Sequence, residues 1–308
     1  MSNYFDASFV TSEEVTDAIA TDRGVVALET TIVVQGLPAP VNLEVAAECE
    51  AAVRESGAVP ATIGVLGGRV VVGLTPEELA QLADPGRHSA KLSARDVGLA
   101  LATSTDGATT VAGTIAVAHR AGLRVMATGG LGGVHRDAAT SFDESADLAA
   151  LARTPMLVVA SGVKSILDIG ATLERLDTLG VPVAGYRTRQ FPGFYLRDSG
   201  HELDWAIASP EEAAAAFLAH RRYSPTGFLV ANPVPADQEL DRTRHDDALE
   251  SALYLARERG VSGKEVTPAL LAEFARHSAG ASVQVNRSLV VANARLAGEI
   301  AVALAQLA

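Results

Sequence analysis

Hydrophobic positions along the chain fall into two patterns that alternate from the N-terminal to the C-terminal end. Short continuous apolar runs are typical of strands buried on both faces. Apolar residues three or four positions apart are typical of helices that cover a sheet. The runs predict strands at 24–30, 123–130, 155–162, 181–186 and 227–233, with two more inside 59–74. Helical spacing predicts helices at 42–56, 109–122, 145–153, 166–179 and 209–220, and three more in the last ~60 residues.

Local signals refine these boundaries. Asn42 is a candidate N-cap, and a Gly67-Gly68 turn separates the two strands inside 59–74. Thr75, followed by Pro76 and Glu78, has the sequence of a capping box. The stretch 190–208 is the least regular and is expected to be a long loop near a site. Alternation of strands and helices predicts an α/β chain with helices on both sheet faces, and we favour a single large domain over two.

Composition narrows the class of protein. The chain has 308 residues, of which 48% are hydrophobic and 5% aromatic, enough for a large core of closely packed layers. A net charge of −12 argues against nucleic acid as a partner. The single cysteine, Cys49, excludes an internal disulfide framework. The first residues lack a signal-peptide pattern, and we find no apolar run of roughly 20 residues, so we expect a cytoplasmic protein without a membrane partner.

Lys164 is the sharpest candidate for chemistry. Only three of the 25 basic residues are lysines, and Lys164 follows the apolar run at 155–162, where a helix is expected to start. The positive end of a helix dipole and apolar neighbours both favour the uncharged amine. An uncharged amine is what an imine-forming nucleophile needs, and arginine cannot supply one. The alternative is a lysine whose ammonium group extends to solvent.

Carboxylates supply the next candidates. Glu29 ends the apolar run at 24–30, where burial would favour the protonated form of a general acid. Pairing with an arginine is the alternative. Asp143 and Asp147 are four residues apart, so a helix reaching back to Asp143 would place both on one face, suited to a divalent cation. Otherwise they are acids that complement a helix N-terminus.

Phosphate-binding elements are weaker signals. The glycine-rich stretches 106–114 and 128–136 each offer backbone amides at an expected helix start. Lys91 lies in a polar stretch before a helix and either binds phosphate or is a solvated loop residue. His135 and Arg136 are expected at the surface, as is Lys264 in a turn.

Taken together, these segments resemble the pseudouridine-5′-phosphate glycosidase family, also called the indigoidine synthase A-like family. The resemblance runs in order along nearly the whole chain. The segments that carry it are "VALETTIVVQGLPAPVNLE", "GAVPATIGVL", "KLSARD", "GATTVAGT", "ATGGLGGVHRDAATSFDESADL", "SGVKSILDIGATLERLDTLGVPVAGY", "FPGFYLRDSG", "LVANPVP" and "GKEVTPALL".

The resemblance implies a three-layer α/β/α sandwich with a mixed central sheet, a homotrimer and a requirement for Mn²⁺. It implies reversible cleavage of pseudouridine 5′-phosphate by water to uracil and ribose 5-phosphate. By the same resemblance, Lys164 is the nucleophile that forms an imine at C1′ of the sugar, Glu29 is the proton donor, and Asp143 binds the metal ion. Positions matching substrate-binding residues of the family are Lys91, Val111, Ser145, Ala146, Asp147 and Asn286.

The departures from the family pattern bear on the identity of the base that is joined to the sugar, because Glu29, Asp143 and Lys164 are all present. The chain has Thr30, Val34 and Gln35 where the family usually reads "ALESTIISHG", so a histidine is replaced. It reads "ASGVKS" in place of "CAGAKS", and Ala94-Arg95-Asp96 in place of "RRD". The alternative function is therefore biosynthetic C-ribosylation of an aromatic polyketide with ribose 5-phosphate. A sugar kinase of the ribokinase type is a further alternative, but the sequence contains no G-x-x-x-x-G-K-[ST] phosphate loop to support it. A non-catalytic sugar-phosphate sensor is another, but such a protein would need neither Glu29 nor Lys164.

Overall fold

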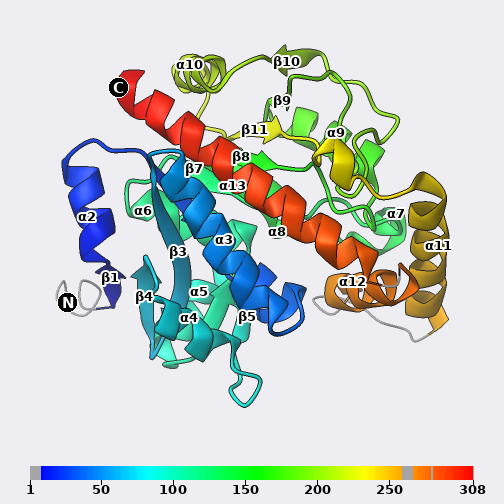
Figure 1. Ribbon diagram of the computed structural model, residues 1–308, viewed down its shortest axis with the longest axis horizontal. Coiled ribbons are helices and arrows are strands. Elements are labelled where there is room, and N and C mark those ends of the chain that lie inside the picture. The colour runs from blue at the N-terminus through cyan, green and yellow to red at the C-terminus, as the bar shows by residue number, and fades with distance from the viewer. Residues whose placement is uncertain (1–7, 259–265, 279, 308) are drawn as a thin grey trace.

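The fold is organised around one mixed β-sheet. A computed structural model describes residues 8–258, 266–278 and 280–307 (Figure 1). The strands are β1 (Phe9–Thr11), β2 (Val25–Leu28), β3 (Val59–Leu66), β4 (Arg69–Val72), β5 (Ala90–Leu92), β6 (Gly107–Thr109), β7 (Val125–Ala127), β8 (Leu157–Ala160), β9 (Val183–Tyr186), β10 (Trp205–Ile207) and β11 (Phe228–Ala231). Their order is β1-β4-β3-β2-β7-β8-β11-β9-β10, with β6 paired to β3 and β5 to β6.

Parallel pairing dominates the part of the sheet that carries the predicted site. β2, β7, β8 and β11 are consecutive and parallel, so their carboxyl ends meet at one edge. Antiparallel pairing occurs where β3 meets β4 and β6. Every residue of β2, β8 and β11 is buried, as their continuous apolar runs require for strands covered on both faces. The mixed sheet implied by the family resemblance is confirmed.

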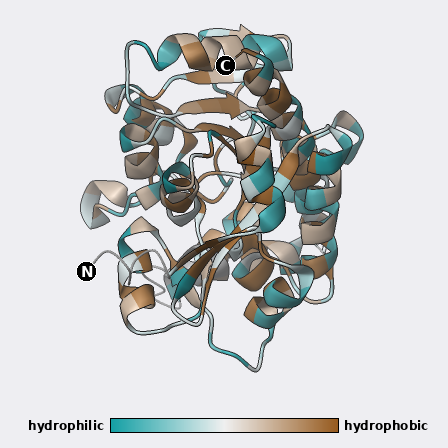
Figure 2. Cartoon of the chain, turned by 90° about the vertical axis from the view of Figure 1, so that its left-hand side faces the viewer, coloured by the Kyte–Doolittle hydropathy of each residue, from teal (hydrophilic) through white to brown (hydrophobic). Residues whose placement is uncertain are grey.

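Helices cover both faces of this sheet. They are α2 (Glu13–Ala20), α3 (Val41–Glu55), α4 (Pro76–Ala83), α5 (Ala94–Ala102), α6 (Val111–Arg120), α7 (Ala138–Ser141), α8 (Ala146–Arg153), α9 (Ile169–Thr178), α10 (Pro210–His220), α11 (Arg242–Glu258), α12 (Val266–His277) and α13 (Ala281–Leu307), with a π-helical turn η1 (Ile32–Gly36) and a 3₁₀ turn η2 (Ala236–Gln238). α3 and α13 lie side by side over one face, and α6 and α8 lie on the other (Figure 1). Figure 2 shows the apolar strands enclosed between these layers. The chain is thus a single-domain α/β protein.

The long helix α13 corrects one expectation from the sequence. By length and composition it could cross a membrane, although no such segment was expected. Most of its apolar residues are buried, because it packs on α3, α10 and the strands β2, β7 and β8. It is therefore a core helix of this fold.

Most predicted elements are present, and the errors are local. The hairpin around Gly67-Gly68 and the capping box of Thr75 with Glu78 are confirmed. Asn42 does not cap α3, because the helix begins one residue earlier and the Asn42 side chain donates to the Val33 carbonyl, 2.8 Å away. The stretch 190–208 contains the short edge strand β10, which its irregular composition concealed. Lys264 lies outside the described residues.

Candidate active site

A cavity of about 690 Å³ opens at the carboxyl ends of β2, β7 and β8. Strand ends are where ligands bind in open α/β sheets. The starts of α6 and α8, the turn η1, the strand β5 and single residues of α12 and α13 also line it. The residues predicted for the site all line this cavity: Glu29, Lys91, Val111, Asp143, Ser145, Ala146, Asp147, Lys164 and Asn286.

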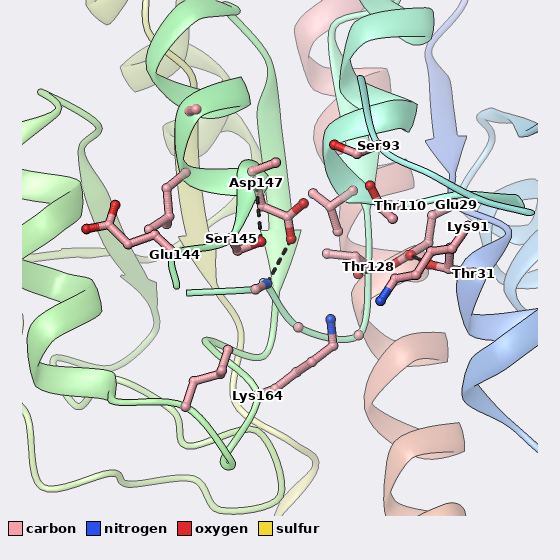
Figure 3. Close-up of a pocket in the computed structure, with 18 of the residues that line it drawn as sticks. Glu29, Thr31, Lys91, Ser93, Thr110, Thr128, Glu144, Ser145, Asp147 and Lys164 are labelled. Carbon is pink, nitrogen blue, oxygen red and sulfur yellow. Dashed lines mark hydrogen bonds between the residues drawn. The ribbon is translucent and has the colours of Figure 1, made fainter. Parts of the chain in front are cut away.

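Glu29 is a buried carboxylate held by two hydroxyl groups. It directly follows β2 and is 9% exposed. The Thr31 hydroxyl donates to one carboxylate oxygen and the Thr128 hydroxyl to the other (Figure 3). No ion pair among the described residues involves Glu29, so the arginine pairing considered from the sequence is not what orients it there. The two threonines fix the plane of the Glu29 carboxyl group.

Lys164 lies in the cavity, but not at the start of a helix. α9 begins at Ile169, with its Asp168 side chain accepting from the Ala171 amide at 2.9 Å. The expectation that a helix dipole acts directly on Lys164 is therefore wrong, because Asp168 caps the helix four residues later. The Lys164 side chain is half-buried and reaches into the same space as the Lys91 side chain (Figure 3).

The loop that carries Lys164 is held by backbone contacts from several directions. The Lys164 amide donates to the Leu131 carbonyl at 3.2 Å. Arg136 is exposed, as expected, yet its guanidinium donates to the carbonyls of Ser165 (3.1 Å) and Ile166 (3.2 Å). Gly162 has a positive φ of 77°, and a Cβ there would meet the carbonyl oxygen of Pro192. This geometry requires glycine beside the lysine.

Asp147 holds two backbone segments together. It lies in the first turn of α8, is 6% exposed, and follows the N-cap Ser145, whose hydroxyl accepts from the Asp147 amide at 3.2 Å. Its carboxylate accepts from the amides of Ala112 (2.9 Å) and Gly132 (2.8 Å) (Figure 3). Asp147 thereby joins the start of α6 to the glycine-rich loop after β7.

Asp143 and Asp147 do not share a helix face. α8 begins at Ala146, and Phe142, with a φ of 56°, ends the short helix α7 immediately before Asp143. The arrangement of two carboxylates on one helical turn is therefore wrong. Asp143 is instead a loop residue in the cavity wall, half-exposed and 3.8 Å from Nε2 of His135.

A divalent cation fits this wall only as a mostly hydrated ion. Among the described residues, no group of three or more His, Cys, Asp or Glu side chains could enclose a metal. Asp143 offers one accessible carboxylate, with the His135 imidazole next to it. Carboxylate oxygens are suitable ligands for hard cations that keep several waters and bind substrate phosphate. The residues present fit that mode of binding and exclude a cage made of described protein ligands.

A cationic and amide-rich wall faces Glu29. Lys91 is the central residue of β5 and is half-buried, so the solvated-loop alternative is wrong. β5 pairs with β6, which leads into α6, where Thr110 caps the helix by accepting from the Gly113 amide at 3.3 Å. Val111 is the first residue of α6 and is buried. A lysine beside a helix N-terminus is a suitable arrangement for a phosphate group.

Asn286 and Gln35 bring side-chain amides to the cavity. Asn286, on α13, is 6% exposed, and its Oδ1 has no hydrogen-bond partner among the described residues. Gln35, in η1, donates from Nε2 to the Ser89 carbonyl at 3.2 Å, and its Oε1 likewise lacks a partner there. Buried polar atoms are seldom left unpaired, so the orphaned oxygens mark the part of the site built for a polar group.

The sequence analysis did not identify Thr31 or Arg136 as parts of the site. Thr31 stands two residues after Glu29 and Arg136 follows the glycine-rich loop, but neither pattern is specific. The Thr31 contact to Glu29 is local but depends on the backbone conformation after β2, and the Arg136 contacts are to backbone carbonyls 29 and 30 positions away. No spacing rule reveals either.

Comparisons with known proteins agree on one family. The indigoidine synthase A-like protein family matches residues 14–303. A pseudouridine-5′-phosphate glycosidase from Salinispora tropica is 60% identical over 95% of this chain and 90% of its own. One of the same name from Streptomyces griseus is 54% identical over 96% and 91%. Among solved structures, the prealnumycin C-glycosynthase AlnA in complex with ribulose 5-phosphate has a TM-score of 0.89 at 40% identity, covering 97% of both chains.

The fold and the cavity, with a lysine and a buried glutamate at parallel strand ends, define an α/β enzyme of the C-glycosidase class. The chain belongs to the indigoidine synthase A-like family. The ribokinase-type alternative is accordingly set aside.

Proposed function

We propose that the enzyme makes and breaks the carbon–carbon bond between C1′ of ribose 5-phosphate and a base, with pseudouridine 5′-phosphate and water giving uracil and ribose 5-phosphate reversibly. The observation that carries the proposal is the convergence of Glu29 and Lys164, from separate strand ends, in one cavity with Lys91. The names of the relatives at 54% and 60% identity support the same substrate.

The sugar phosphate is proposed to bind against the start of α6. Lys91 supplies a positive charge, and the backbone from Val111 onward supplies the helix N-terminus. The segment Ser145-Ala146-Asp147 lies beside it, with Asp147 keeping the α6 start and the glycine-rich loop in register. Asp143 would hold one Mn²⁺ ion, which when bound would offset the repulsion between phosphate and carboxylate oxygens.

In the proposed reaction Glu29 transfers a proton and Lys164 forms a covalent bond to the sugar. Protonation of the ring oxygen O4′ by Glu29 lets the C1′–O4′ bond break while the Lys164 amine bonds to C1′. The bonded lysine nitrogen then loses its extra proton to the Glu29 carboxylate. The C1′–C5 bond to uracil breaks with its electron pair going to C5, C5 takes that proton from Glu29, and the lone pair of the lysine nitrogen forms the C1′ imine. Water hydrolyses the imine, which releases ribose 5-phosphate and restores the amine.

A second candidate is C-ribosylation of an aromatic polyketide, run in the direction of bond formation. It is favoured by the similarity to a C-glycosynthase structure and by changed residues: Gln35, which lines the cavity, and Ser161 and Val163, in the segment that leads to Lys164. The same sugar-binding wall and the same Lys164 would serve both reactions. Only the acceptor would differ.

Assembly and location complete the proposal. We expect a homotrimer in the cytoplasm, as inferred from the sequence. Size-exclusion chromatography with light scattering tests the trimer directly, with a monomer mass as the contradicting result.

The deciding experiment measures carbon–carbon bond formation with two kinds of acceptor in one series. Purified enzyme with Mn²⁺ and ribose 5-phosphate is offered uracil or an aromatic polyketide-type acceptor, and C-glycosides are identified by mass spectrometry. Product with uracil supports the main proposal, and product with the aromatic acceptor alone supports the second. Borohydride reduction with ribose 5-phosphate should add a sugar-phosphate mass to the peptide that contains Lys164. Absence of that adduct, together with full activity of Lys164→Ala, would overturn the mechanism.

A further inference from the structure

Asn293 lies at the centre of a buried hydrogen-bond network outside the proposed catalytic roles. It is on α13, seven residues after Asn286, and is completely buried. Its Nδ2 lies 2.8 Å from the Thr128 carbonyl oxygen, 3.3 Å from that of Gly129 and 3.0 Å from the Ser161 hydroxyl. Its Oδ1 accepts from Asn232 Nδ2 at 2.9 Å.

The partners of Asn293 stand at the ends of three neighbouring parallel strands. Thr128 follows β7, Ser161 follows β8, and Asn232 follows β11. Backbone carbonyls only accept, so the amide nitrogen of Asn293 must face Thr128 and its oxygen must face Asn232. One rigid side chain therefore links the carboxyl ends of β7, β8 and β11.

Two of these strand ends are connected to the groups assigned to chemistry: the β7 end contacts Glu29, which itself follows β2, and the β8 end leads to Lys164. The Thr128 hydroxyl donates to Glu29, while its carbonyl accepts from Asn293. Ser161 is three residues before Lys164, and its amide donates to the Gly129 carbonyl at 2.9 Å. The third strand end, at Asn232, carries neither the acid nor the amine.

We propose that Asn293 is a positioning residue that fixes the separation of Glu29 and Lys164. It acts through Thr128 on the acid and through the Ser161 segment on the amine. This inference rests on the proposed function, because it concerns the two groups that function assigns to chemistry. Misplacement of a reacting group by about 1 Å can cost on the order of 10²-fold in rate, so a small shift of these strand ends has a measurable effect.

A purely structural role makes a different prediction. If Asn293 only stabilised the fold, its loss would lower the melting temperature and the folded fraction, and each folded molecule would turn over normally. A positioning role lowers kcat for each folded molecule and leaves KM for the sugar phosphate nearly unchanged, because Lys91 and the α6 start are not bonded to Asn293.

The test compares Asn293→Asp with Asn232→Ala. Asn293→Asp keeps the shape but turns the amide donor into an oxygen facing the Thr128 and Gly129 carbonyls. We expect kcat to fall about 10- to 100-fold with KM within threefold. Borohydride trapping of ribose 5-phosphate on Lys164 should slow by a similar factor. Asn232→Ala, which removes only the β11 contact, should keep kcat within threefold. Thermal unfolding and circular dichroism establish that each variant is folded.

The other possible results each overturn the inference about Asn293 or lead to a second variant that tests it. A folded Asn293→Asp with kcat within threefold of the parent overturns the inference, as does an Asn232→Ala that loses as much as Asn293→Asp. If Asn293→Asp does not fold, Asn293→Ser, which retains a hydroxyl donor, is judged by the same limits. If neither folds, Asn293 serves the fold and the inference fails. If the parent enzyme shows no activity and forms no borohydride-reduced adduct with ribose 5-phosphate, the proposed function fails as well. This result distinguishes failure of the proposed function from failure of the inference about Asn293.

Discussion

The two walls of the cavity use their polar groups in opposite ways. The strand-end wall (Glu29, Thr128 and Lys164) presents side chains, and their neighbours hold them in place. In the helix-start wall (Thr110, Val111, Ser145 and Asp147), the charged side chain of Asp147 is itself engaged with backbone amides. We therefore propose that the strand-end wall takes part in the reaction and that the helix-start wall binds the substrate. Substitutions in the first should change kcat, and substitutions in the second should change KM.

Replacement of Lys164 should produce the largest effect. Lys164→Ala removes the amine, and we expect kcat to fall on the order of 10⁴-fold or more, because removal of a nucleophile disables the whole catalytic unit. Steady-state kinetics measure this loss. Lys164→Arg is the matched control, since it keeps the positive charge but cannot form an imine. Activity of Lys164→Ala above one per cent of the parent activity would contradict the assignment of Lys164 as the nucleophile of the strand-end wall.

Replacement of Glu29 should rank second. Glu29→Gln keeps the size of the side chain and one acceptor oxygen but cannot transfer a proton, so we expect kcat to fall about 10²- to 10⁴-fold. KM for pseudouridine 5′-phosphate should stay within about threefold, because Glu29 lies in the reacting wall. Thr31→Val, which removes only one hydroxyl donor, is the milder comparison. An effect confined to KM would contradict the assignment.

Among the substitutions, replacement of Asp143, the proposed metal ligand, should have the next largest effect. Chelation with EDTA should abolish activity, and added Mn²⁺ should restore it. In Asp143→Asn we expect the Mn²⁺ concentration for half-maximal activity to rise about 10- to 100-fold, as metal affinities do when a coordinating environment is weakened. Glu144→Gln, at the neighbouring position that pairs with Arg175 at 2.8 Å, serves as the control. Full activity in EDTA would show that the proposed ion is not needed.

Replacement of Asp147 should give the smallest of the four effects, mainly on binding. Asp147→Asn turns an amide NH₂ towards the backbone N–H of Ala112 or Gly132, so one buried donor loses its partner. We expect the free energy of unfolding to fall by about 1–3 kcal/mol. The α6 start should shift, and KM for ribose 5-phosphate should rise roughly tenfold with a smaller change in kcat. A kcat loss as large as that of Glu29→Gln would place Asp147 in the reacting wall instead.

Glu29 and Lys164 were candidates from the sequence because each follows a continuous apolar run, whereas Val111, Ser145, Ala146 and Asn286 came from the family resemblance. Glu29 and the Lys164 segment stand where such runs end, and parallel strands bring their carboxyl ends to one edge. The prediction of where the helix after Lys164 begins was wrong. Helical spacing suggested a helix from Ile166, directly after Lys164, but α9 begins at Ile169 and is capped by Asp168. Periodicity cannot locate a helix start within a few residues, because loop residues such as Ile166 are also buried.

The sequence by itself determined the class of fold, the order of most elements, and the residues Glu29, Lys91, Asp143 and Lys164 as candidates, because local pattern and residue chemistry are written along the chain. Only the tertiary structure decided how they are held. The hydroxyl of Thr128 on Glu29, the amides bound by Asp147, and the link made by Asn293 join residues up to 165 positions apart. Such contacts depend on which strands become neighbours, and strand order is set by packing of the whole sheet between its helices, not by any local segment.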